Sequence, residues 1–507
     1  MALTTHICSQ LLEKATAFAQ MTLDDDYIVR DNKPDVLRVI YTFGSIQPED
    51  IKAGNGNAWI TGKLCFHVLY QSDDENHRLE SISGEIPFQE KIVMDDLEDG
   101  DEVFAEVQLE DLSVGIINSR KLVVRAVLNV TAKSLQERDE AVACGAPEEY
   151  GYQQKTRSLP LLSVVTNKKD VVRISKEMLL PNARSNVGTI LFYQVDLRNQ
   201  EVILQEEKAL VQMDAQVMVL YRSESTGDYE CYETTVPLSG ELELPMIEGD
   251  EIFWAKMTPL EMLVEPRSDY DGEARMLGLE LSLGVEIQVY REYECDVLED
   301  AYSLEKELHL QRKTFWANQL LMKNLSKVRL MEQVQLEPNR ERILQICGCS
   351  GKVTIDRVQR REDGILVEGI LNVHILYNTT EDAMPYAHNS SQLAFEQFVE
   401  MQGVDEDTII RMDTQVEQLQ VNLLDNMEYE AKAILQIGVL AMRKIPIENI
   451  VSIEEEELDL ETLQKQAGMI GYIRGENEDL WDIAKRYHAT AENILEVGNK
   501  VLVIKQV

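Results

Sequence analysis

Basic residues, histidine and long apolar runs are scarce in this chain of 507 residues. Its 49 Lys and Arg stand against 90 Asp and Glu, which gives a formal charge of −41. A field of that sign repels phosphate backbones and anionic lipid, so it argues against nucleic acid or an acidic membrane surface as a direct partner. No stretch approaches the roughly 18 apolar residues that a membrane-spanning helix needs. Hydrophobic residues nevertheless make up 44% of the chain, which excludes a mainly disordered protein.

Catalytic signatures are also missing. The seven histidines show no HExxH spacing, and no GxSxG nucleophile motif is present. The segment Gly54–Trp59 begins like a dinucleotide fingerprint but lacks the third glycine, so its glycines are interpreted as turn residues. His67 and His374 occupy equivalent places in two similar segments and are interpreted as structural. No cofactor or metal is expected.

Cysteine usage points to a reducing compartment. The seven cysteines are an odd number and are scattered, except for Cys347 and Cys349. These two lack further local metal ligands, so we interpret them as buried thiols, although their roles stay open.

The amino-terminal segment lacks the basic and apolar regions of a secretion signal, which favours a cytoplasmic location. Its apolar residues lie close to one helical face instead: Leu3, Ile7, Leu11, Ala15 and Phe18. We therefore expect a short docking helix over 1–26.

Repetition organises the acidic part of the chain. An aliphatic pair followed by tyrosine occurs three times, ending at Tyr70, Tyr221 and Tyr377. Each copy follows a proline and precedes a short apolar return and an acidic turn. The prolines are Pro34, Pro181 and Pro338, and the turns are Glu98–Asp101, Glu248–Asp250 and Val404–Asp407. Because these landmarks recur in one order, the sequence predicts three copies of one unit.

The alternation of strand side chains gives a sharper expectation for these copies. The residues two before each tyrosine should share its sheet face, whereas the residues immediately before it should point to the other face. The first set is Val68, Val219 and Ile375, and the second is Leu69, Leu220 and Leu376.

Each unit is predicted to be β. Segments such as Leu64–Tyr70 and Gly369–Tyr377 alternate between two faces and are bounded by turn residues, as half-buried strands are. The predicted fold class is therefore mainly β, with three repeated antiparallel, sandwich-like domains and a small C-terminal α+β module. The expected divisions are a helix at 1–26, β domains at 27–136, 137–302 and 303–450, an acidic linker at 451–467 and the module at 468–507. The third domain is expected to begin with a helical linker over 303–325.

An amphipathic helix is predicted near the C-terminus. Its apolar residues recur at the i, i+3, i+4, i+7 spacing: Leu480, Ile483, Ala484 and Tyr487. Asp479 can cap this helix, and Thr490 is placed to cap a second one whose inward residues would be Ile494 and Leu495. Val501–Ile504 then predicts a strand. The region 468–507 thus resembles a LysM module, a small βααβ fold that usually serves as a binding unit.

Two departures from the LysM pattern bear on the ligand. Asn477 stands where the family has a turn glycine, and the loop before the last strand is shortened to Glu496–Lys500. Since that loop forms one wall of the glycan groove in LysM modules, the resemblance favours a protein ligand over a sugar. The residues expected to contact the ligand are Asn477, Glu478, Asp479, Leu480, Val497 and Gly498.

Three repeats followed by a LysM-like module resemble the SPOCS-domain spore-coat assembly proteins, the SipL-like family. In the first unit the resemblance rests on Ser72–Asn76, Gly84–Phe88 and Asp111–Lys121. It implies a non-enzymatic adaptor in the mother-cell cytoplasm at the forespore surface. Its LysM module would bind a coat basement-layer ATPase or another coat morphogenetic protein.

The main alternative is LysM-mediated binding to peptidoglycan, through glycans that contain N-acetylglucosamine. A third hypothesis is that the protein is an enzyme, and the motifs give this hypothesis little support. The sequence leaves open the partner's identity, the oligomeric state and the functional surface of the repeats.

Overall fold

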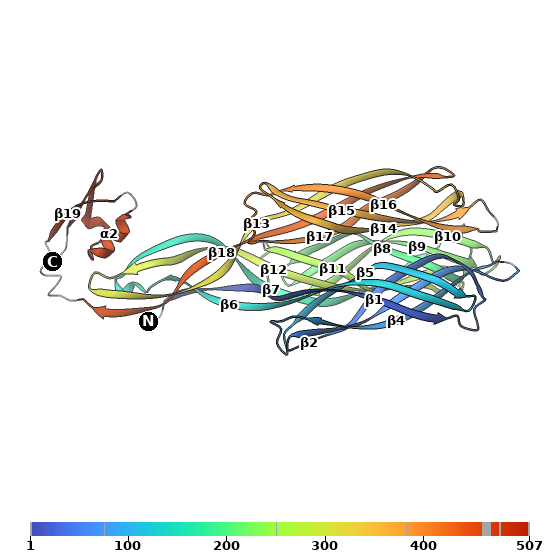
Figure 1. Cartoon of the computed structure of the whole chain (residues 1–507), viewed down its shortest axis with the longest axis horizontal. Helices are drawn as coiled ribbons and strands as arrows, with labels where there is room; N and C mark the ends of the chain where they lie inside the picture. The colour runs from blue at the N-terminus through green and yellow to red at the C-terminus, as the bar shows by residue number, and fades with distance from the viewer. Residues whose placement is uncertain are drawn as a thin grey trace.

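The computed structural model describes residues 3–75, 77–249, 251–381, 383–458, 468–475 and 478–504. These residues form three units of six antiparallel strands each, followed by a small C-terminal module (Figure 1). The predicted fold class, mainly β with three repeated antiparallel domains, is confirmed.

The strands have the following bounds. The first unit has β1 (Thr4–Ile28), β2 (Val36–Gly54), β3 (Asn57–Ser72), β4 (Leu79–Val93), β5 (Val103–Asn118) and β6 (Lys121–Gly145). A 3-10 turn, η1 (Glu148–Tyr150), leads to the second unit with β7 (Gln153–Leu179), β8 (Val187–Gln205), β9 (Lys208–Ser223), β10 (Tyr229–Glu243), β11 (Ile252–Arg267) and β12 (Met276–Tyr302). The third unit has β13 (Lys306–Gln335), β14 (Ile343–Arg361), β15 (Gly364–Thr379), β16 (Tyr386–Glu400), β17 (Thr408–Asp425) and β18 (Glu428–Glu457).

Each unit is a sandwich of two three-stranded sheets. In the first unit the sheet β1-β6-β5 packs on β2-β3-β4, and the same order recurs in the second and third units. A single bridge between Leu162 and Asn318 joins β7 to β13, so two of the sheets form one six-stranded sheet. In every unit the inward residues of both sheets share one hydrophobic core.

The three tyrosines occupy equivalent places in the middle strands β3, β9 and β15. Each is buried, and its hydroxyl donates to a backbone carbonyl 36 residues upstream. The pairs are Tyr70 with Pro34 at 3.0 Å, Tyr221 with Ser185 at 3.1 Å and Tyr377 with Glu341 at 3.3 Å. The predicted equivalence is confirmed, and the hydroxyl anchors the segment that enters the second strand of each unit.

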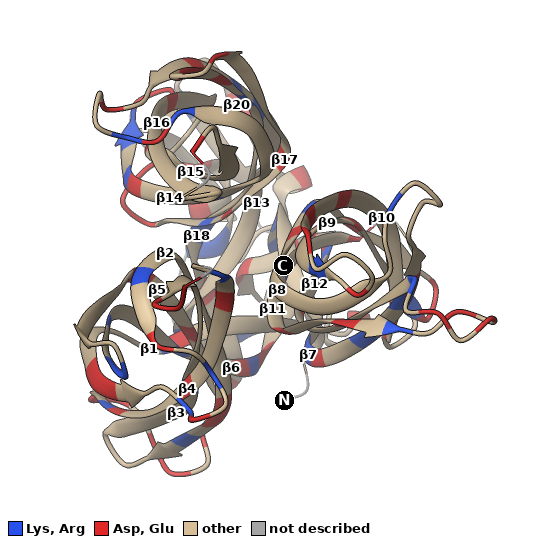
Figure 2. Ribbon diagram, turned by 90° about the vertical axis from the view of Figure 1, so that its right-hand side faces the viewer, with Lys and Arg blue, Asp and Glu red and all other residues tan. Residues whose placement is uncertain are grey.

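The predicted alternation of faces is also confirmed. Val68, Val219 and Ile375 lie with the tyrosines in the core of their own unit. The leucines before the tyrosines point the other way, into a cluster that all three units share. This central core consists of Tyr41, Leu69, Leu79, Leu191, Phe192, Met218, Leu220, Cys347, Leu376 and Tyr386. Figure 2 shows the three units arranged around a common centre.

A bulge recurs next to each tyrosine. In each unit, the strand that pairs with the tyrosine has one extra residue without a partner on the middle strand. These extra residues are Ile40 of β2, Leu191 of β8 and Cys347 of β14. A bulge redirects the extra side chain, and these three side chains contribute to the central core or pack against it. Repeated local irregularity thus helps to join the units.

The longest strands extend beyond the sandwiches and form a tapered stem (Figure 1). The stem comprises residues 4–14 with 134–145, 153–164 with 290–302, and 306–321 with 441–457. Bulges at Lys14, Val165 and Leu321 mark the level at which the three strand pairs leave their sandwiches. The stem core is Cys8, Val142, Leu161, Cys295, Val297, Phe315, Ala317 and Ile447, with residues from all three units.

Two predicted helices are wrong. Residues 1–26 were expected to form a helix, but β1 begins at Thr4 and pairs with β6 along its whole length. Alternate residues from Ala15 to Leu23 face the core, whereas Phe18 is 66% exposed. The predicted helical linker over 303–325 is likewise part of β13, which pairs with β18. In both places a partner strand that lies 97 or more residues away decides the conformation, and it overrides a local apolar spacing that suits a helix.

The predicted acidic tether also begins as a strand. Residues Glu454–Glu457 belong to β18 and pair with the start of β13, where Lys306 forms an ion pair with Glu455. Most of the remaining linker, residues 459–467, lies outside the described residues.

The C-terminal module consists of β19 (Met469–Ile473), α2 (Leu480–Arg486), η2 (Ala491–Asn493), β20 (Ile494–Val497) and β21 (Lys500–Ile504), with sheet order β19-β21-β20. Asp479 caps α2 as predicted, accepting the N–H of Trp481. The predicted second helix is wrong, because only a 3-10 turn follows Thr490 and the chain then enters β20. Gly498, with φ of +64°, closes the β20–β21 hairpin, which pulls Ile494 and Leu495 into a strand. Among the described residues, no helix is long and apolar enough to cross a bilayer.

Candidate functional site

The predicted binding residues fall on two sides of the C-terminal module, while Asn477 lies outside the described residues. Glu478 forms a 2.7 Å ion pair with Arg486, and Leu480 packs against the module's core. Val497 and Gly498 form the end and turn of the β20–β21 hairpin.

Arg474 connects these two parts of the predicted site. Its Nε donates to the carbonyl of Glu478 at 2.6 Å, and its guanidinium forms a 2.5 Å ion pair with Glu496 on β20. In the LysM resemblance these two segments are the walls of a groove. Here one arginine binds both of them.

The helix side of the module contacts the tip of the stem. Asp300 near the end of β12 accepts the indole N–H of Trp481 at 2.8 Å and pairs with the Lys485 ammonium at 2.7 Å. Burial opposes the charge of Asp300, but these two donors outweigh it and hold the pKa of the carboxyl below its usual value. Asp479, a predicted binding residue, forms a 2.9 Å ion pair with Lys155 of β7.

A second group of contacts reinforces this docking. The Tyr302 hydroxyl donates to the carbonyl of Ala489 at 2.8 Å, and its ring lies edge-on to Trp481 with centroids 4.9 Å apart. His488 Nδ1 lies 2.9 Å from the carbonyl of Ser303. The docking residues of the stem, Lys155, Asp300 and Tyr302, carried no recognisable signal in the sequence, because their partners are more than 180 residues away.

The opposite side of the module is an exposed apolar sheet face. Alternate residues of β19 and of β20 point away from α2. Four of these side chains are more than half exposed. They are Met469, Ile473, Leu495 and Val497, and Val497 is the most exposed at 78%. We call these four residues the outer face. Val497 therefore remains available to a partner, whereas Asp479 is engaged with the stem.

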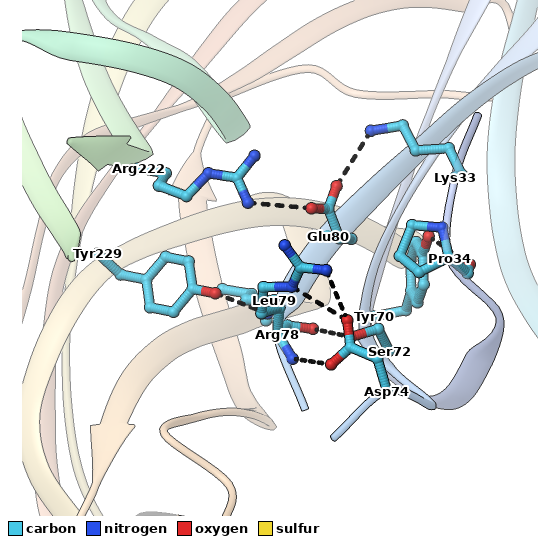
Figure 3. Close-up of polar contacts among 10 residues, drawn as sticks. All are labelled: Lys33, Pro34, Tyr70, Ser72, Asp74, Arg78, Leu79, Glu80, Arg222 and Tyr229. Carbon is cyan, nitrogen blue, oxygen red and sulfur yellow. Dashed lines mark hydrogen bonds and ion pairs between the residues drawn. The ribbon is translucent and has the colours of Figure 1, made fainter. Parts of the chain in front are cut away.

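A dense set of polar contacts at the opposite end of the molecule joins the first and second units (Figure 3). The buried carboxylate of Glu80 pairs with Arg222 of the second unit at 3.0 Å and with Lys33 at 3.3 Å. The backbone N–H of Leu79 donates to the Tyr229 hydroxyl at 2.9 Å. Because the Glu80 carboxylate and the Leu79 N–H both bind protein groups, we interpret the cluster as a structural junction.

The described part of the chain brings together no group of three or more side chains that could hold a metal ion. A depression between the first and third units is lined by Leu37, Arg38, Gln71, His77 and Ala383, and the Gln71 amide there is bonded to the Ala383 carbonyl at 2.7 Å. His67 and His374 lie where the units meet, His67 bound to the Leu191 carbonyl and His374 to His388.

Two segments of the chain match the family model described as SipL, SPOCS domain: residues 35–117 and 342–424. The first window spans β2 to β5 and the second spans β14 to β17, which are the same four strands of two different units. The second unit lies outside both windows but has the same strand order. No curated protein and no solved structure matches the chain significantly.

Proposed function

We propose that this protein is a non-enzymatic adaptor in spore-coat assembly, which presents a shortened LysM module to a protein partner at the end of a rigid stem. The two SPOCS-domain matches support the role in the coat. The partner would be a coat basement-layer ATPase or another coat morphogenetic protein. The proposed place of action is the mother-cell cytoplasm at the forespore surface.

One observation carries this proposal: the module uses its helix side to hold the stem and leaves its sheet side free. The bonds from Asp300 to Trp481 and Lys485 fix the helix side. Exposed apolar side chains such as Val497 and Ile473 suit a protein partner, because apolar anchors supply most of the energy of protein interfaces.

Glycan binding receives less support from the same geometry. A sugar site needs several converging polar groups in a concavity. Among the described residues of this module, two polar pairs beside the expected groove are already bonded, Glu478 to Arg486 and Arg474 to Glu496. Peptidoglycan is therefore the competing ligand in the test.

The test compares two valine substitutions in the full-length protein. Val497→Glu places a charge on the outer face, and Val93→Glu does the same at a comparably exposed valine of the first unit. Both variants and the parent protein would be titrated with purified coat basement-layer protein and with peptidoglycan fragments. We expect Val497→Glu to weaken protein binding by about tenfold or more, and Val93→Glu to leave it unchanged.

Tight glycan binding without protein binding would reverse the proposal. Hydrolysis of peptidoglycan, peptide or nucleotide by the purified protein, abolished by a point substitution, would overturn the non-enzymatic role.

A further inference from the structure

Two cysteines from different units meet in the stem. The sulfur atoms of Cys144 on β6 and Cys295 on β12 are 3.8 Å apart, although 151 residues separate them in the chain. Cys295 is buried, whereas Cys144 is only half-buried. The pair therefore brings the first unit into contact with the second inside the stem, and neither cysteine belongs to the outer face that the proposed function assigns to a partner.

Local geometry explains why Cys144 faces another unit. Thr5 of β1 pairs with Ala143 and Thr4 pairs with Gly145, so Cys144 is the extra residue of a bulge. The extra residue of a bulge is released from the ladder and can turn its side chain toward a neighbouring element. Cys144 thereby approaches β12.

The same arrangement recurs between the second and third units. Cys347 is the bulge residue of β14, and its thiol donates to the Asn378 side-chain oxygen at 2.7 Å. The Cys231 thiol of β10 lies close enough to raise the pKa of Cys347. Both thiol pairs therefore join one bulge cysteine to a cysteine of a neighbouring unit. This recurrence favours a role for paired thiols over an accidental contact in the stem.

We propose that Cys144 and Cys295 form a reversible disulfide that ties the first unit to the second within the stem. A disulfide bond is about 2.05 Å long, so the sulfur atoms must approach by a little under 2 Å for the bond to form. Metal binding by this pair is disfavoured, since the described residues form no group of three that could hold a metal ion. Cys8, the third thiol of the stem core, is instead hydrogen-bonded to the Leu162 carbonyl and the Gln10 amide.

A low-molecular-weight disulfide such as oxidised glutathione supplies the oxidant. The Cys144 thiolate, its proton lost to solvent, attacks one sulfur of oxidised glutathione and expels a glutathione thiolate. The Cys295 thiolate then attacks the Cys144 sulfur, forms the protein disulfide and expels the second glutathione thiolate. The cysteines lose two electrons and two protons, and one oxidised glutathione becomes two thiols.

The environment of Cys295 sets the expected pH dependence. Burial, together with the neighbouring Cys144 thiol, raises the pKa of Cys295. The thiolate needed for the second step is therefore scarce near neutral pH, and the reaction should accelerate as pH rises.

The experiment uses the reduced full-length protein under native conditions. It would be incubated with oxidised glutathione between pH 7 and 9, quenched with an alkylating reagent, digested without reduction and mapped by mass spectrometry. We expect a cross-linked peptide that joins Cys144 to Cys295, faster formation at higher pH, and loss of the cross-link after reduction. The oxidised protein should unfold at a higher temperature than the reduced protein.

Matched variants test the assignment. Cys144→Ser should abolish the cross-link, whereas Cys65→Ser, at a half-buried cysteine of β3, should leave it intact. Mapping of the parent protein decides the question even if a variant fails to fold. Recovery of both thiols in alkylated form after oxidation, or of Cys144 only as a mixed disulfide with glutathione, would overturn the proposal.

Discussion

At the scale of single residues, the units are joined by a few buried charges whose partners come from another unit. The Glu80 side chain is 10% exposed and bonds Arg222 across the boundary between the first and second units (Figure 3). A charge buried to this degree is costly when a partner is removed, because Glu80 has lost most of its water and would keep only the longer 3.3 Å pair with Lys33.

Arg222→Met should therefore destabilise the protein more than a comparable change elsewhere. The matched control is Arg267→Met, since Arg267 pairs with Glu280, a carboxylate that is 55% exposed and keeps its hydration. We expect a loss of about 3 kcal/mol in unfolding free energy for Arg222→Met and less than about 1 kcal/mol for Arg267→Met, measured by urea unfolding. Equal losses for the two variants would show that Glu80 does not depend on Arg222.

A second residue-scale prediction concerns acid stability. His374 Nδ1 lies 3.2 Å from His388 Nε2, and the ring of Tyr41 from the first unit stacks on His388. Burial, followed by repulsion from His374, lowers the pKa of His388 to about 3. In the unfolded chain the His388 imidazole binds a proton near pH 6.5, whereas in the folded chain it stays neutral until about pH 3. The folded state therefore loses stability as pH falls from about 6.5 toward 3.

His388→Phe keeps an aromatic ring against Tyr41 but removes this proton uptake. Denaturant midpoints of the variant should fall less steeply between pH 6.5 and 4 than those of the parent protein. His309→Phe, at an exposed histidine paired with Glu456, is the control and should leave the slope unchanged. An unaltered slope in His388→Phe would contradict the assignment.

At the scale of elements, the stem is a platform made of strand ends. One of its three strand pairs, β7 with β12, presents Lys155, Asp300 and Tyr302 to the C-terminal module, and Asp300 accepts bonds from two of the module's residues. The position of the module therefore depends on side chains at the ends of β7 and β12.

Asp300→Ala should release the module from the stem without unfolding either part. The indole of Trp481 would lose its acceptor, and proteolysis of the segment between β18 and β19 should accelerate. Asp296→Ala, an exposed position on the same strand, is the control. Unchanged proteolysis and unchanged tryptophan fluorescence in Asp300→Ala would argue that the remaining contacts suffice for docking.

At the scale of the whole molecule, the three units behave as one body because they share two cores. The central core gathers the leucines that precede the repeated tyrosines, and the stem core gathers residues from every strand pair. In the stem, the Asn449 amide of the third unit also bonds the Ala141 carbonyl and the Ala143 N–H of the first at 2.8 Å each. Separate unfolding of one unit would expose these surfaces in all three.

Leu220→Ala tests this coupling. The substitution should cost about 3 kcal/mol through the cavity it leaves, and hydrogen exchange should accelerate in β3, β9 and β15 together. Leu242→Ala removes a comparable side chain from the second unit's own core, so its effect should be largest within that unit. Acceleration restricted to the second unit in both variants would contradict a shared core.

The sequence by itself determined the repeat, the β class, the facing of the tyrosines and the cap at Asp479, because each depends on local alternation or on landmarks that recur along the chain. The tertiary structure decided the rest. Residues 4–28 and 306–335 are strands only because distant partners pair with them, and Leu69, Leu220 and Leu376 form a core only when three units meet. For the candidate site, the sequence indicated the C-terminal module but not which of its sides faces the stem. Asp300 and Lys155 bind the module through long-range contacts that no local sequence pattern encodes.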